Sequence, residues 1–417
     1  MSLLPPLYAA ATGLLEPFAP GLLKRRAAQG KEDPARLGER LGRASRPRPP
    51  GPLVWLHGVS VGESLSLLPL VEALRARRPD LALLVTSGTV TSAELLAKRL
   101  PQGVIHQFAP VDAPGAVRRF LDHWRPGLGL QVESELWPNL IRGAHARGVK
   151  LVLASARMTE ASAKGWSRVP GAARDLLSCF ELILPQDAAT AERLARLGGR
   201  LGPALNLKRV GDPLPCDPTE LARLKAAIGD RRVILAASTH PGEEAVIARA
   251  AMGLDALLVV AVRHPDRGAA VAAELAGLGL RVARRAAGET PGAEVDAYVA
   301  DTLGEMGLFF RLADMAVMGG SFVGGIGGHN PLEPARLGVP LVTGPDHFNA
   351  AELYEEMFAE VAAIEAANEA ALARHLEGLM TYPQIRRQMG DAALTYAERQ
   401  GAALQAALAL IEPLVPA

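Results

Sequence analysis

The sequence predicts an α/β protein made of two Rossmann-like domains, and three observations support this prediction. The chain has 417 residues, which is too long for one ordinary hydrophobic core. Of its residues 49% are hydrophobic and only 4% are aromatic, a composition typical of globular α/β proteins rather than disordered ones. Short apolar runs alternate with amphipathic segments along most of the chain, and this alternation indicates parallel βαβ units.

The first series of alternating segments begins after a proline-rich connector at Arg46–Pro52. Its expected strands are Leu53–His57, Leu81–Val85, Val104–Phe108, Leu128–Val132, Leu151–Ala154 and Leu182–Pro185. Its expected helices lie near 63–77, 91–100, 114–124, 135–147 and 187–198. In such sheets, ligands bind outside the carboxyl ends of the strands.

The second series follows a segment rich in Gly and Pro, Gly199–Pro218, which we interpret as the interdomain linker. Its expected strands are Val233–Ala237, Leu257–Val262, Ala297–Ala300, Met315–Met318 and Leu341–Gly344. A long final helix is expected from about Ile385 to Leu414. The predicted divisions are an N-terminal segment at 1–48, a first domain at 49–205 and a second domain at 206–417.

Charge and cysteine content exclude several classes of protein. The net charge is only +1, which argues against general nucleic-acid binding. Cys179 and Cys216 are the two cysteines, so neither a disulfide framework nor a thiolate metal cluster is expected. This cysteine usage suits a reducing cytosol, and the N-terminus lacks the features of a secretory signal.

The N-terminal segment combines apolar and cationic stretches. Residues 3–23 are largely apolar, but Pro5, Pro6, Glu16, Pro17 and Pro20 interrupt them, so they make a poor membrane span. Residues 24–48 hold nine Lys or Arg against three acids, a net charge of +6. This arrangement suits attachment to an anionic membrane surface. A docked N-terminal helix with a solvated basic face is an equally good interpretation of the composition.

A glycine-rich stretch late in the chain indicates a nucleotide site. The apolar run at 315–318 leads into GGSFVGGIGGHNPLEPAR, in which Asn330 and Pro331 are typical of a helix start. A strand, a glycine loop and a helix N-terminus together bind phosphate, because free N–H groups and the helix dipole face the anion. Glu333 lies one turn into this helix, where it suits hydrogen bonds from ribose hydroxyls. The alternative is a glycine-rich turn without a ligand.

Two common nucleotide motifs are absent from the sequence. No GxGxxG motif follows the first strand of a βαβ unit, as the dinucleotide fingerprint requires. No GxxxxGK[ST] loop is present, so the sequence does not support an ATPase or kinase function. A late glycine loop followed by Glu is instead the arrangement of nucleotide-sugar glycosyltransferases.

Five motifs in order resemble those of the 3-deoxy-D-manno-oct-2-ulosonic acid (Kdo) transferases, which build the inner core of lipopolysaccharide. The motifs are WLHGVSVGE at 55–63, VESELWPNL at 132–140, STHPGEE at 238–244, VRHP at 262–265 and GHNPLE at 328–333. The similarity extends over nearly the whole chain. It implies the GT-B architecture of two facing Rossmann-like domains, with an N-terminal membrane-associating segment and a C-terminal helix that returns to the first domain.

The resemblance also implies an activity and its partners. It implies an inverting transferase that moves Kdo from CMP-Kdo to the lipid A precursor lipid IVA, at the cytoplasmic face of a Gram-negative inner membrane. The leaving group is a monophosphate, which fits one phosphate loop. Since no HExxH or Asp-x-Asp motif is present, we expect neither a metal nor a cofactor.

Three residues are candidates for catalysis. An inverting sugar transfer needs a carboxylate that takes the proton of the acceptor hydroxyl. Glu63 follows the first expected strand, although a Glu stabilised by a helix dipole is common there. The resemblance implies that Glu63 is the base, that Glu133 supports the transition state or acceptor site, and that Lys208 lies near the leaving group. Alternatively, Glu133 or Glu135 anchors the following helix, and Lys208 is merely solvated.

The second domain supplies the candidate nucleotide-binding residues. Arg263 and His264 end a buried-type strand, where Arg can hold phosphate through two parallel hydrogen bonds. With them we assign the loop and helix residues Gly319, Gly320, Ser321, Asn330, Pro331, Leu332 and Glu333. Ser238, Thr239 and His240 end the neighbouring strand and are candidate donor contacts. For each His, a structural role is the alternative.

Two other functions stay open at this point. One is a non-catalytic sugar-nucleotide-binding protein, because fold does not dictate function. The other is an epimerase or transferase that uses a UDP-sugar. The presence of Glu63, Lys208, Arg263 and Glu333 disfavours the first.

Overall fold

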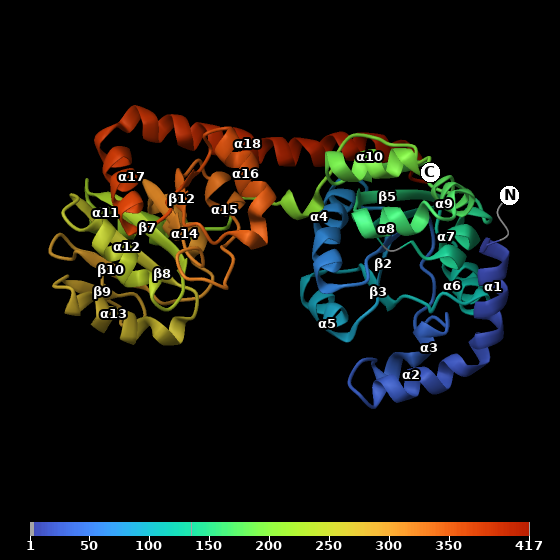
Figure 1. Ribbon diagram of the computed structural model, residues 1–417. Coiled ribbons are helices and arrows are strands. Elements are labelled where there is room, and N and C mark those ends of the chain that lie inside the picture. The colour runs from blue at the N-terminus through green and yellow to red at the C-terminus, as the bar shows by residue number, and fades with distance from the viewer. Residues whose placement is uncertain (1–3, 135, 417) are drawn as a thin grey trace. The chain divides into compact units, whose positions relative to one another are not determined.

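The structure is a computed structural model that describes residues 4–134 and 136–416. Its chain divides into two compact units, shown in Figure 1. Unit 1 comprises Met1–Gly211 and Gln400–Ala417, and unit 2 comprises Asp212–Arg399. The division therefore falls between 211 and 212, whereas the sequence analysis set the domain limit between 205 and 206.

Unit 1 is built on one parallel sheet of six strands in the order β3-β2-β1-β4-β5-β6. The strands are β1 (Leu53–His57), β2 (Ala82–Ser87), β3 (Ile105–Phe108), β4 (Leu128–Val132), β5 (Lys150–Ala156) and β6 (Leu182–Pro185). All neighbouring pairs are parallel, as the alternating pattern predicts. This order is the one found in Rossmann folds, with the reversal between β1 and β4.

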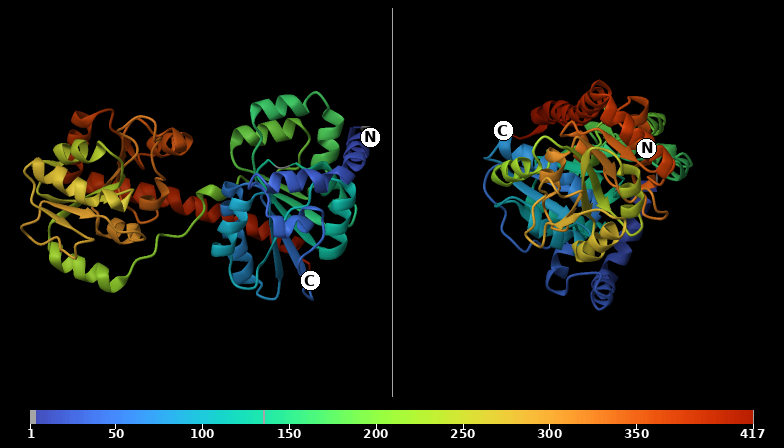
Figure 2. Two further views of the ribbon diagram at one scale, coloured as in Figure 1. Left: turned by 90° about the horizontal axis from the view of Figure 1, so that it is seen from below. Right: turned by 90° about the vertical axis from the view of Figure 1, so that its left-hand side faces the viewer.

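Helices cover both faces of the first sheet, as Figure 2 shows. They are α4 (Val61–Arg77), α5 (Val90–Arg99), α6 (Pro114–Trp124), α7 (Pro138–His145), α8 (Glu160–Trp166), α9 (Pro170–Leu177) and α10 (Ala188–Arg196). One hydrophobic cluster joins α6 and α7 to Leu53 and Trp55, and the other joins α4 and α5 to Val54 and Leu56. The alternation along β1 therefore supplies both cores.

The N-terminal segment folds as a chain of short helices on unit 1. They are α1 (Leu4–Leu15), η1 (Glu16–Phe18), α2 (Ala19–Ala27), η2 (Pro34–Arg36) and α3 (Leu37–Arg40). Helix α1 lies beside α6 and α7, with which it makes contacts (Figure 1). Among the described helices, none has the length and apolar character that crossing a bilayer requires.

Unit 2 has one parallel sheet of seven strands in the order β13-β12-β11-β7-β8-β10-β9. The strands are β7 (Arg232–Thr239), β8 (Ala256–Val262), β9 (Val282–Arg284), β10 (Ala297–Ala300), β11 (Met315–Met318), β12 (Leu341–Thr343) and β13 (Ile364–Glu365). Strand β7 lies between β8 and β11, so this sheet also reverses its order beside its first strand. The sequence analysis missed β9 and β13, which have three and two residues.

The helices of unit 2 flank its sheet in the same layered manner (Figure 2). They are α11 (Pro218–Ile228), α12 (Glu243–Ala251), α13 (Gly268–Gly277), α14 (Met306–Leu312), α15 (Leu332–Ala335), α16 (Ala351–Ala359), α17 (Glu369–Thr381) and α18 (Pro383–Ile411). Helix α18 begins in unit 2, and its last turns pack in the core of unit 1 through Leu404, Leu408 and Ile411. The long final helix predicted from the sequence is therefore present.

Candidate active site

The candidate residues of unit 1 lie at the carboxyl ends of its two central strands. Glu63 follows β1, and Glu133 follows β4. These strands are neighbours, and the strand order reverses between them. Ligands of open α/β sheets bind at this reversal. The structure thus brings two of the three predicted catalytic residues to the expected place in unit 1.

The carboxylate of Glu63 is held by the first turn of its own helix. Oε2 accepts a hydrogen bond from the backbone N–H of Val59 at 2.6 Å, and Oε1 accepts one from Ser60 Oγ at 2.9 Å. Ser60 is the N-cap, and its Oγ accepts from the N–H of Glu63 at 3.3 Å. This pattern is a variant of the capping box, in which the Glu side chain binds the N–H of Val59 and the hydroxyl of Ser60 instead of the N-cap N–H. Glu63 is buried, and its carboxylate is oriented by groups within four residues of it in the sequence.

Glu133 has an unusual backbone conformation and a charged partner. Its φ of 61° lies in the left-handed region, which costs a non-glycine residue energy and recurs at functional sites. Its buried Oε1 lies 2.7 Å from Nζ of Lys208, whose side chain is 49% exposed. The ion pair joins two predicted catalytic residues that are 75 positions apart in the sequence. Glu135, the second acid of this motif, lies outside the described residues.

Lys208 is fixed by the chain around it. The backbone N–H of Leu207 donates to Ser155 Oγ at 3.2 Å, and Asn206 Oδ1 accepts from the N–H of Lys208 at 3.2 Å. Leu205 and Leu207 are buried in the core of unit 1. Ser155 also has a positive φ, 51°. The part of the expected linker around Lys208 is therefore docked on unit 1 rather than free.

In unit 2 the candidates lie at the carboxyl ends of β7, β8 and β11. Ser238 and Thr239 end β7 and His240 follows it, Arg263 and His264 follow β8, and Gly319 to Ser321 follow β11. Strands β7 and β11 are neighbours at the reversal of this sheet. A Cβ on Gly319 would lie 2.6 Å from the carbonyl oxygen of Ser238, so only glycine allows the two strand ends to approach this closely.

A buried carboxylate of the chain occupies the N–H groups of the glycine loop. Oε2 of Glu243 accepts from the N–H of Gly320 at 2.6 Å and of His240 at 2.9 Å. Its Oε1 accepts from the N–H groups of Ser321 and Phe322, both at 2.9 Å. Glu243 is fully buried. Because these donors already bind an anion, the phosphate contacts assigned to Gly320 and Ser321 stay predictions.

Three histidines gather beside this loop. Nε2 of His240 lies 3.0 Å from Nε2 of His329, so one ring donates and the other accepts. The rings of these two residues are stacked, and His264 meets His240 edge-on. Burial lowers the pKa of both His240 and His329, and the charge of Arg263 acts in the same direction. The pair is therefore neutral at physiological pH and offers hydrogen bonds rather than charge.

Arg263 and Glu333 have the electrostatics expected of a ligand site. Arg263 and His264 are exposed at the end of β8. Burial raises the pKa of Glu333, although Arg336 and Arg263 oppose this effect. Asn330 Oδ1 accepts from the N–H of Leu332 at 3.1 Å, and a helix of four residues, α15, follows. The predicted helix start is thus present, but the helix is short.

Other predicted contacts have structural partners in unit 2. The hydroxyl of Thr239, which is fully buried, donates to Oε1 of Glu244 at 2.9 Å. Leu332 is fully buried in the core, and Pro331 is buried at the start of α15. Ser238 has a φ of 58°, a third positive value at the end of a central strand. The ligand contacts assigned to these four residues are not tested by the structure.

The sequence analysis missed several residues that shape the two sites. Glu243 and His329 belong to quoted motifs but were not assigned, although an acid at a helix start beside a glycine loop is an available signal. In unit 1, His57 and Gln131 are register partners on β1 and β4. Both are buried, and Nε2 of His57 and the amide of Gln131 have no hydrogen-bond partner among the described residues. Burial lowers the pKa of His57 to about 4.

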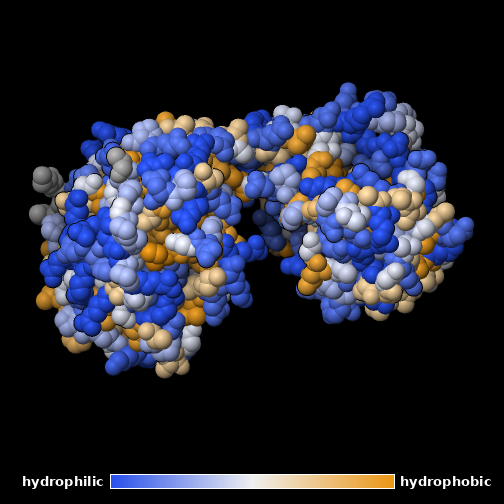
Figure 3. All heavy atoms as spheres, turned by 180° about the vertical axis from the view of Figure 1, so that it is seen from behind, coloured by the Kyte–Doolittle hydropathy of each residue, from blue (hydrophilic) through white to orange (hydrophobic). Residues whose placement is uncertain are grey.

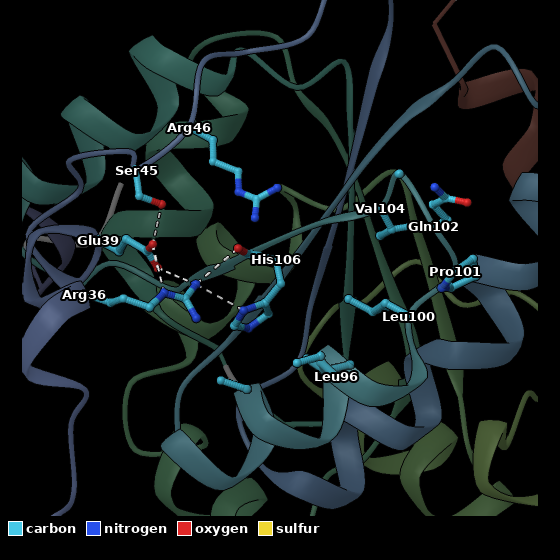
Figure 4. Close-up of a pocket in the computed structure, with 13 residues that line it drawn as sticks. Arg36, Glu39, Ser45, Arg46, Leu96, Leu100, Pro101, Gln102, Val104 and His106 are labelled. Atoms are coloured by element: carbon cyan, nitrogen blue, oxygen red, sulfur yellow. Dashed lines mark hydrogen bonds and ion pairs between the residues drawn. The ribbon is translucent and has the colours of Figure 1, made fainter.

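A separate cavity of about 610 Å³ lies at the edge strand β3 (Figure 4). Glu39 lies in one wall of this cavity and accepts from Arg36, from Ser45 Oγ and from the N–H of Phe108. Figure 4 shows Arg36 reaching past Glu39 to His106. These contacts neutralise Arg36, and Arg26 and Arg40 pair with Glu32 in the same way. Part of the cationic segment therefore serves the fold of unit 1.

No group of three or more His, Cys, Asp or Glu suited to a metal ion occurs in the part of the chain that the structure describes. His240, His264 and His329, which lie beside the glycine loop, do not form such a group. Besides one another, their charged neighbours include Glu243, whose carboxylate is occupied by four N–H donors, and the cation Arg263.

Comparison with known proteins decides the family. A sequence profile of 3-deoxy-D-manno-octulosonic-acid transferase (kdotransferase) matches residues 35–209. The chain is 32% identical to the 3-deoxy-D-manno-octulosonic acid transferase of Rickettsia bellii, over 93% of this chain and 94% of that protein. It is 33% identical to the enzyme of the same name from Haemophilus influenzae, over 91% of each. The chain belongs to the Kdo transferase family. It is therefore a glycosyltransferase of lipopolysaccharide biosynthesis.

Solved structures show the fold of this Kdo transferase. MurG from Acinetobacter baumannii aligns with 87% of this chain and 100% of its own, at 12% identity and a TM-score of 0.54. The C-terminal CMP-Kdo binding domain of WaaA from Acinetobacter baumannii aligns with 43% of this chain and 96% of its own, at 30% identity and a TM-score of 0.41. The predicted GT-B architecture of two parallel-sheet α/β domains is confirmed.

Proposed function

We propose that this Kdo transferase moves Kdo from CMP-Kdo to the lipid A precursor lipid IVA, with inversion and without a metal ion. One observation carries the proposal. A chain that belongs to the Kdo transferases holds Glu63 and the Glu133–Lys208 ion pair at the strand reversal of unit 1. These are the residues that an inverting transfer needs for proton removal and charge compensation.

The proposed chemistry is a single displacement. The hydroxyl oxygen of the acceptor forms a bond to the anomeric carbon of Kdo as the bond from that carbon to the phosphate oxygen of CMP breaks. Glu63 takes the hydroxyl proton, and the phosphate keeps the electron pair of the broken bond. To accept the proton, Oε1 of Glu63 gives up its hydrogen bond from Ser60 Oγ, and the Ser60 hydroxyl donates to another acceptor. The backbone N–H of Val59 keeps Oε2 in place.

Glu133 and Lys208 position and compensate charge in this scheme. The buried carboxylate of Glu133 holds the ammonium group of Lys208, and the half-exposed lysine side chain has room to contact a ligand. The left-handed φ of Glu133 is a strained conformation of the kind that recurs at functional sites. Lys208 then offsets negative charge on the leaving group, the role that the resemblance implies.

The nucleotide is assigned to unit 2. Arg263 is exposed at the carboxyl end of β8, where a guanidinium binds a phosphate through two hydrogen bonds. Glu333 is held partly buried nearby, and a carboxylate there accepts bonds from ribose hydroxyls. The neutral His240–His329 pair adds hydrogen-bonding groups at the same edge.

We also propose that the protein works at the cytoplasmic face of the inner membrane. Leu14, Leu15, Phe18 and Leu22 are exposed on the N-terminal helices at 78%, 64%, 72% and 59%. Leu23, which the composition also suggests as a membrane contact, is buried at 3% and belongs to the core instead. Apolar patches reach the surface of unit 1 at this edge (Figure 3). Lys24 and Arg25 are exposed beside them.

The test is a transfer assay with purified protein, CMP-Kdo and lipid IVA, read by the mass of the product. We expect the lipid to gain Kdo, with CMP released, in buffer containing EDTA. UDP-sugars are the control donors. Transfer from a UDP-sugar, dependence on a divalent ion, or CMP binding without any transfer would each contradict the proposal.

A further inference from the structure

An apolar groove of about 450 Å³ lies between the N-terminal helix and the body of unit 1. Helix α1 forms one wall, and α7, α8 and α9 form the others. The side chains that matter here are Leu4, Leu7 and Tyr8 on one side and Pro138, Trp166 and Leu176 on the other. The groove surface is almost wholly carbon, and its volume is typical of small-molecule sites, roughly 300–1,000 Å³.

Polar contacts on the inner face of α1 hold this groove open. The hydroxyl of Tyr8 bonds to the buried carboxyl of Asp112, and burial with this partner raises the pKa of Tyr8 to about 12. Thr12 Oγ1 accepts from Asn139 Nδ2 at 2.9 Å. Glu16 accepts from the N–H of Gly115 at 2.8 Å and from Arg119 at 2.9 Å. These bonds fix α1 at a set position, so the groove is a preformed feature rather than a gap under a loose helix.

The side of α1 that borders the groove is apolar and partly exposed. Leu4 and Leu7 are 44% and 63% exposed and also line the groove, so the groove continues into the apolar surface that ends at Leu14 and Leu15. An apolar surface that a soluble protein leaves uncovered marks an interaction site. Arg142, an exposed cation on the groove wall, indicates an occupant that is both apolar and anionic.

The groove lies at the same edge of the sheet as the candidate catalytic residues. Asp112 follows β3, and Gly115 and Asn139 begin α6 and α7, so all three anchors of α1 lie at the carboxyl ends of the strands. Pro138 of the groove follows Glu133 by five residues in the sequence. Five residues span at most about 18 Å. A sugar bound at Glu133 therefore lies within reach of a chain that enters the groove.

We propose that this groove binds one acyl chain of the lipid acceptor while its sugar lies at Glu63 and Glu133. This inference rests on the proposed function, because it assumes an acylated, anionic acceptor. The walls match hydrocarbon, and Arg142 matches a negative group that borders it. The groove thus selects an acceptor that carries a chain at the right distance from its reacting hydroxyl.

Trp166 supplies a binding assay that needs no turnover. Trp55 and Trp124 are fully buried, and Trp166 lines the groove. Trp137 is partly buried next to Pro138 of the groove wall, so it is replaced by Phe in every protein tested. A brominated fatty acid, used below its micelle concentration, should quench Trp166 fluorescence in the parent protein. Trp166→Phe should remove this quenching. Lipid IVA should displace the probe at lower concentration than phosphatidylglycerol, since only the acceptor also engages the sugar site.

Ala11 and Ala10 give a matched pair of variants on α1. Both are exposed, but only Ala11 lines the groove. Ala11→Phe should fill the groove and weaken probe binding about tenfold, whereas Ala10→Phe should leave it unchanged. In transfer assays Ala11→Phe should raise KM for lipid IVA and leave KM for an acceptor without acyl chains unchanged.

The outcomes separate the two proposals. Any of three results would overturn the acyl-chain site. They are no quenching in the parent protein, equal quenching in Ala11→Phe and Ala10→Phe, and displacement of the probe by phosphatidylglycerol at the same concentration as by lipid IVA. A parent protein that transfers no Kdo would contradict the proposed function. The quenching measurement would still decide whether the groove binds hydrocarbon, because it does not depend on catalysis.

Discussion

Glu63 in unit 1 and Glu243 in unit 2 occupy equivalent places, yet their carboxylates have different partners. Each follows the first strand of its sheet and begins the next helix, and each accepts a hydrogen bond from the N–H of a residue between strand and helix. Among the described residues, the other partner of the Glu63 carboxylate is Ser60, its own N-cap. Glu243 also binds three N–H groups of the loop after β11.

This difference shows how one backbone motif serves two purposes. The bonds of Glu243 join segments that are 77 to 79 residues apart, so its carboxylate acts as an internal anion that shapes the glycine loop. The bonds of Glu63 are local, and losing one of them disturbs nothing beyond the first turn of α4. A carboxylate with replaceable partners is free to exchange protons, whereas one with four fixed donors is not. The same substitution at both sites tests this distinction.

Glu63→Gln should lower turnover about a hundred- to ten-thousandfold, the usual contribution of a general base. The amide still accepts from Val59 and donates to Ser60 Oγ, so the thermal unfolding midpoint and CMP affinity should stay near those of the parent. Transfer assays, thermal unfolding and calorimetry with CMP measure these quantities. Turnover within threefold of the parent would remove Glu63 from the role of base.

Glu243→Gln should instead destabilise unit 2. Glutamine has one acceptor oxygen, so its NH₂ group must face two of the four N–H donors. A hydrogen bond to a charged group contributes about 1.5–3 kcal/mol, and we expect a loss of about 3 kcal/mol or more in unfolding free energy. Urea unfolding measures the loss, and CMP affinity should fall with it. A variant as stable as the parent would show that the loop is not held by this carboxylate.

Replacing Lys24 and Arg25 together by Gln should affect only the acceptor side. Each cation near an anionic surface contributes about 1 kcal/mol, so vesicle binding should weaken by about 2 kcal/mol, or roughly thirtyfold. Floatation with anionic vesicles measures this change, and CMP affinity is the control. Arg26 is left intact because it pairs with buried Glu32. Undiminished floatation would place the membrane contact elsewhere.

Arg263→Ala and Glu333→Ala should each weaken CMP binding about tenfold, through phosphate and ribose respectively. In the part of the chain that the structure describes, neither side chain bonds to Glu243, so stability should change little. Calorimetry with CMP and with cytidine separates the two effects, because cytidine lacks the phosphate. Arg263→Ala should bind cytidine as tightly as the parent does, whereas Glu333→Ala should still bind it more weakly. Parent-like CMP binding by both variants would remove the nucleotide from this edge of unit 2.

The sequence predicts the sheets better than the sites. Strands such as Leu53–His57 and Met315–Met318 are recovered to the residue, because continuous apolar runs bounded by turn residues leave little choice. Strands β9 and β13 were missed, since two or three residues carry no periodicity. Lys208 was assigned from a family motif alone, and its ion pair with Glu133 depends on tertiary structure.

Sequence patterns do not predict which groups bind one another in the folded protein. The glycine loop predicts available N–H donors, but whether phosphate or a buried Glu binds them depends on how α12 packs beneath the loop. Likewise, the net charge of the basic segment predicts a membrane surface, while the structure uses Arg36 and Arg40 in contacts with Glu39 and Glu32. Charge counts add all cations equally, whereas folding removes some of them from the surface.

The contacts of Glu39 have a practical consequence for anyone who wishes to shorten the protein. This buried acid satisfies the N–H of Phe108 on the edge strand β3, and the guanidinium of Arg36 lies over the Phe108 ring. Deleting residues 1–48 to remove the exposed leucines would also remove Arg36 and Glu39, and the edge of β3 would then be exposed. An uncovered edge strand is a template for pairing between molecules. Polar substitution of Leu14 and Phe18 is therefore the safer route to a protein that stays dispersed without detergent.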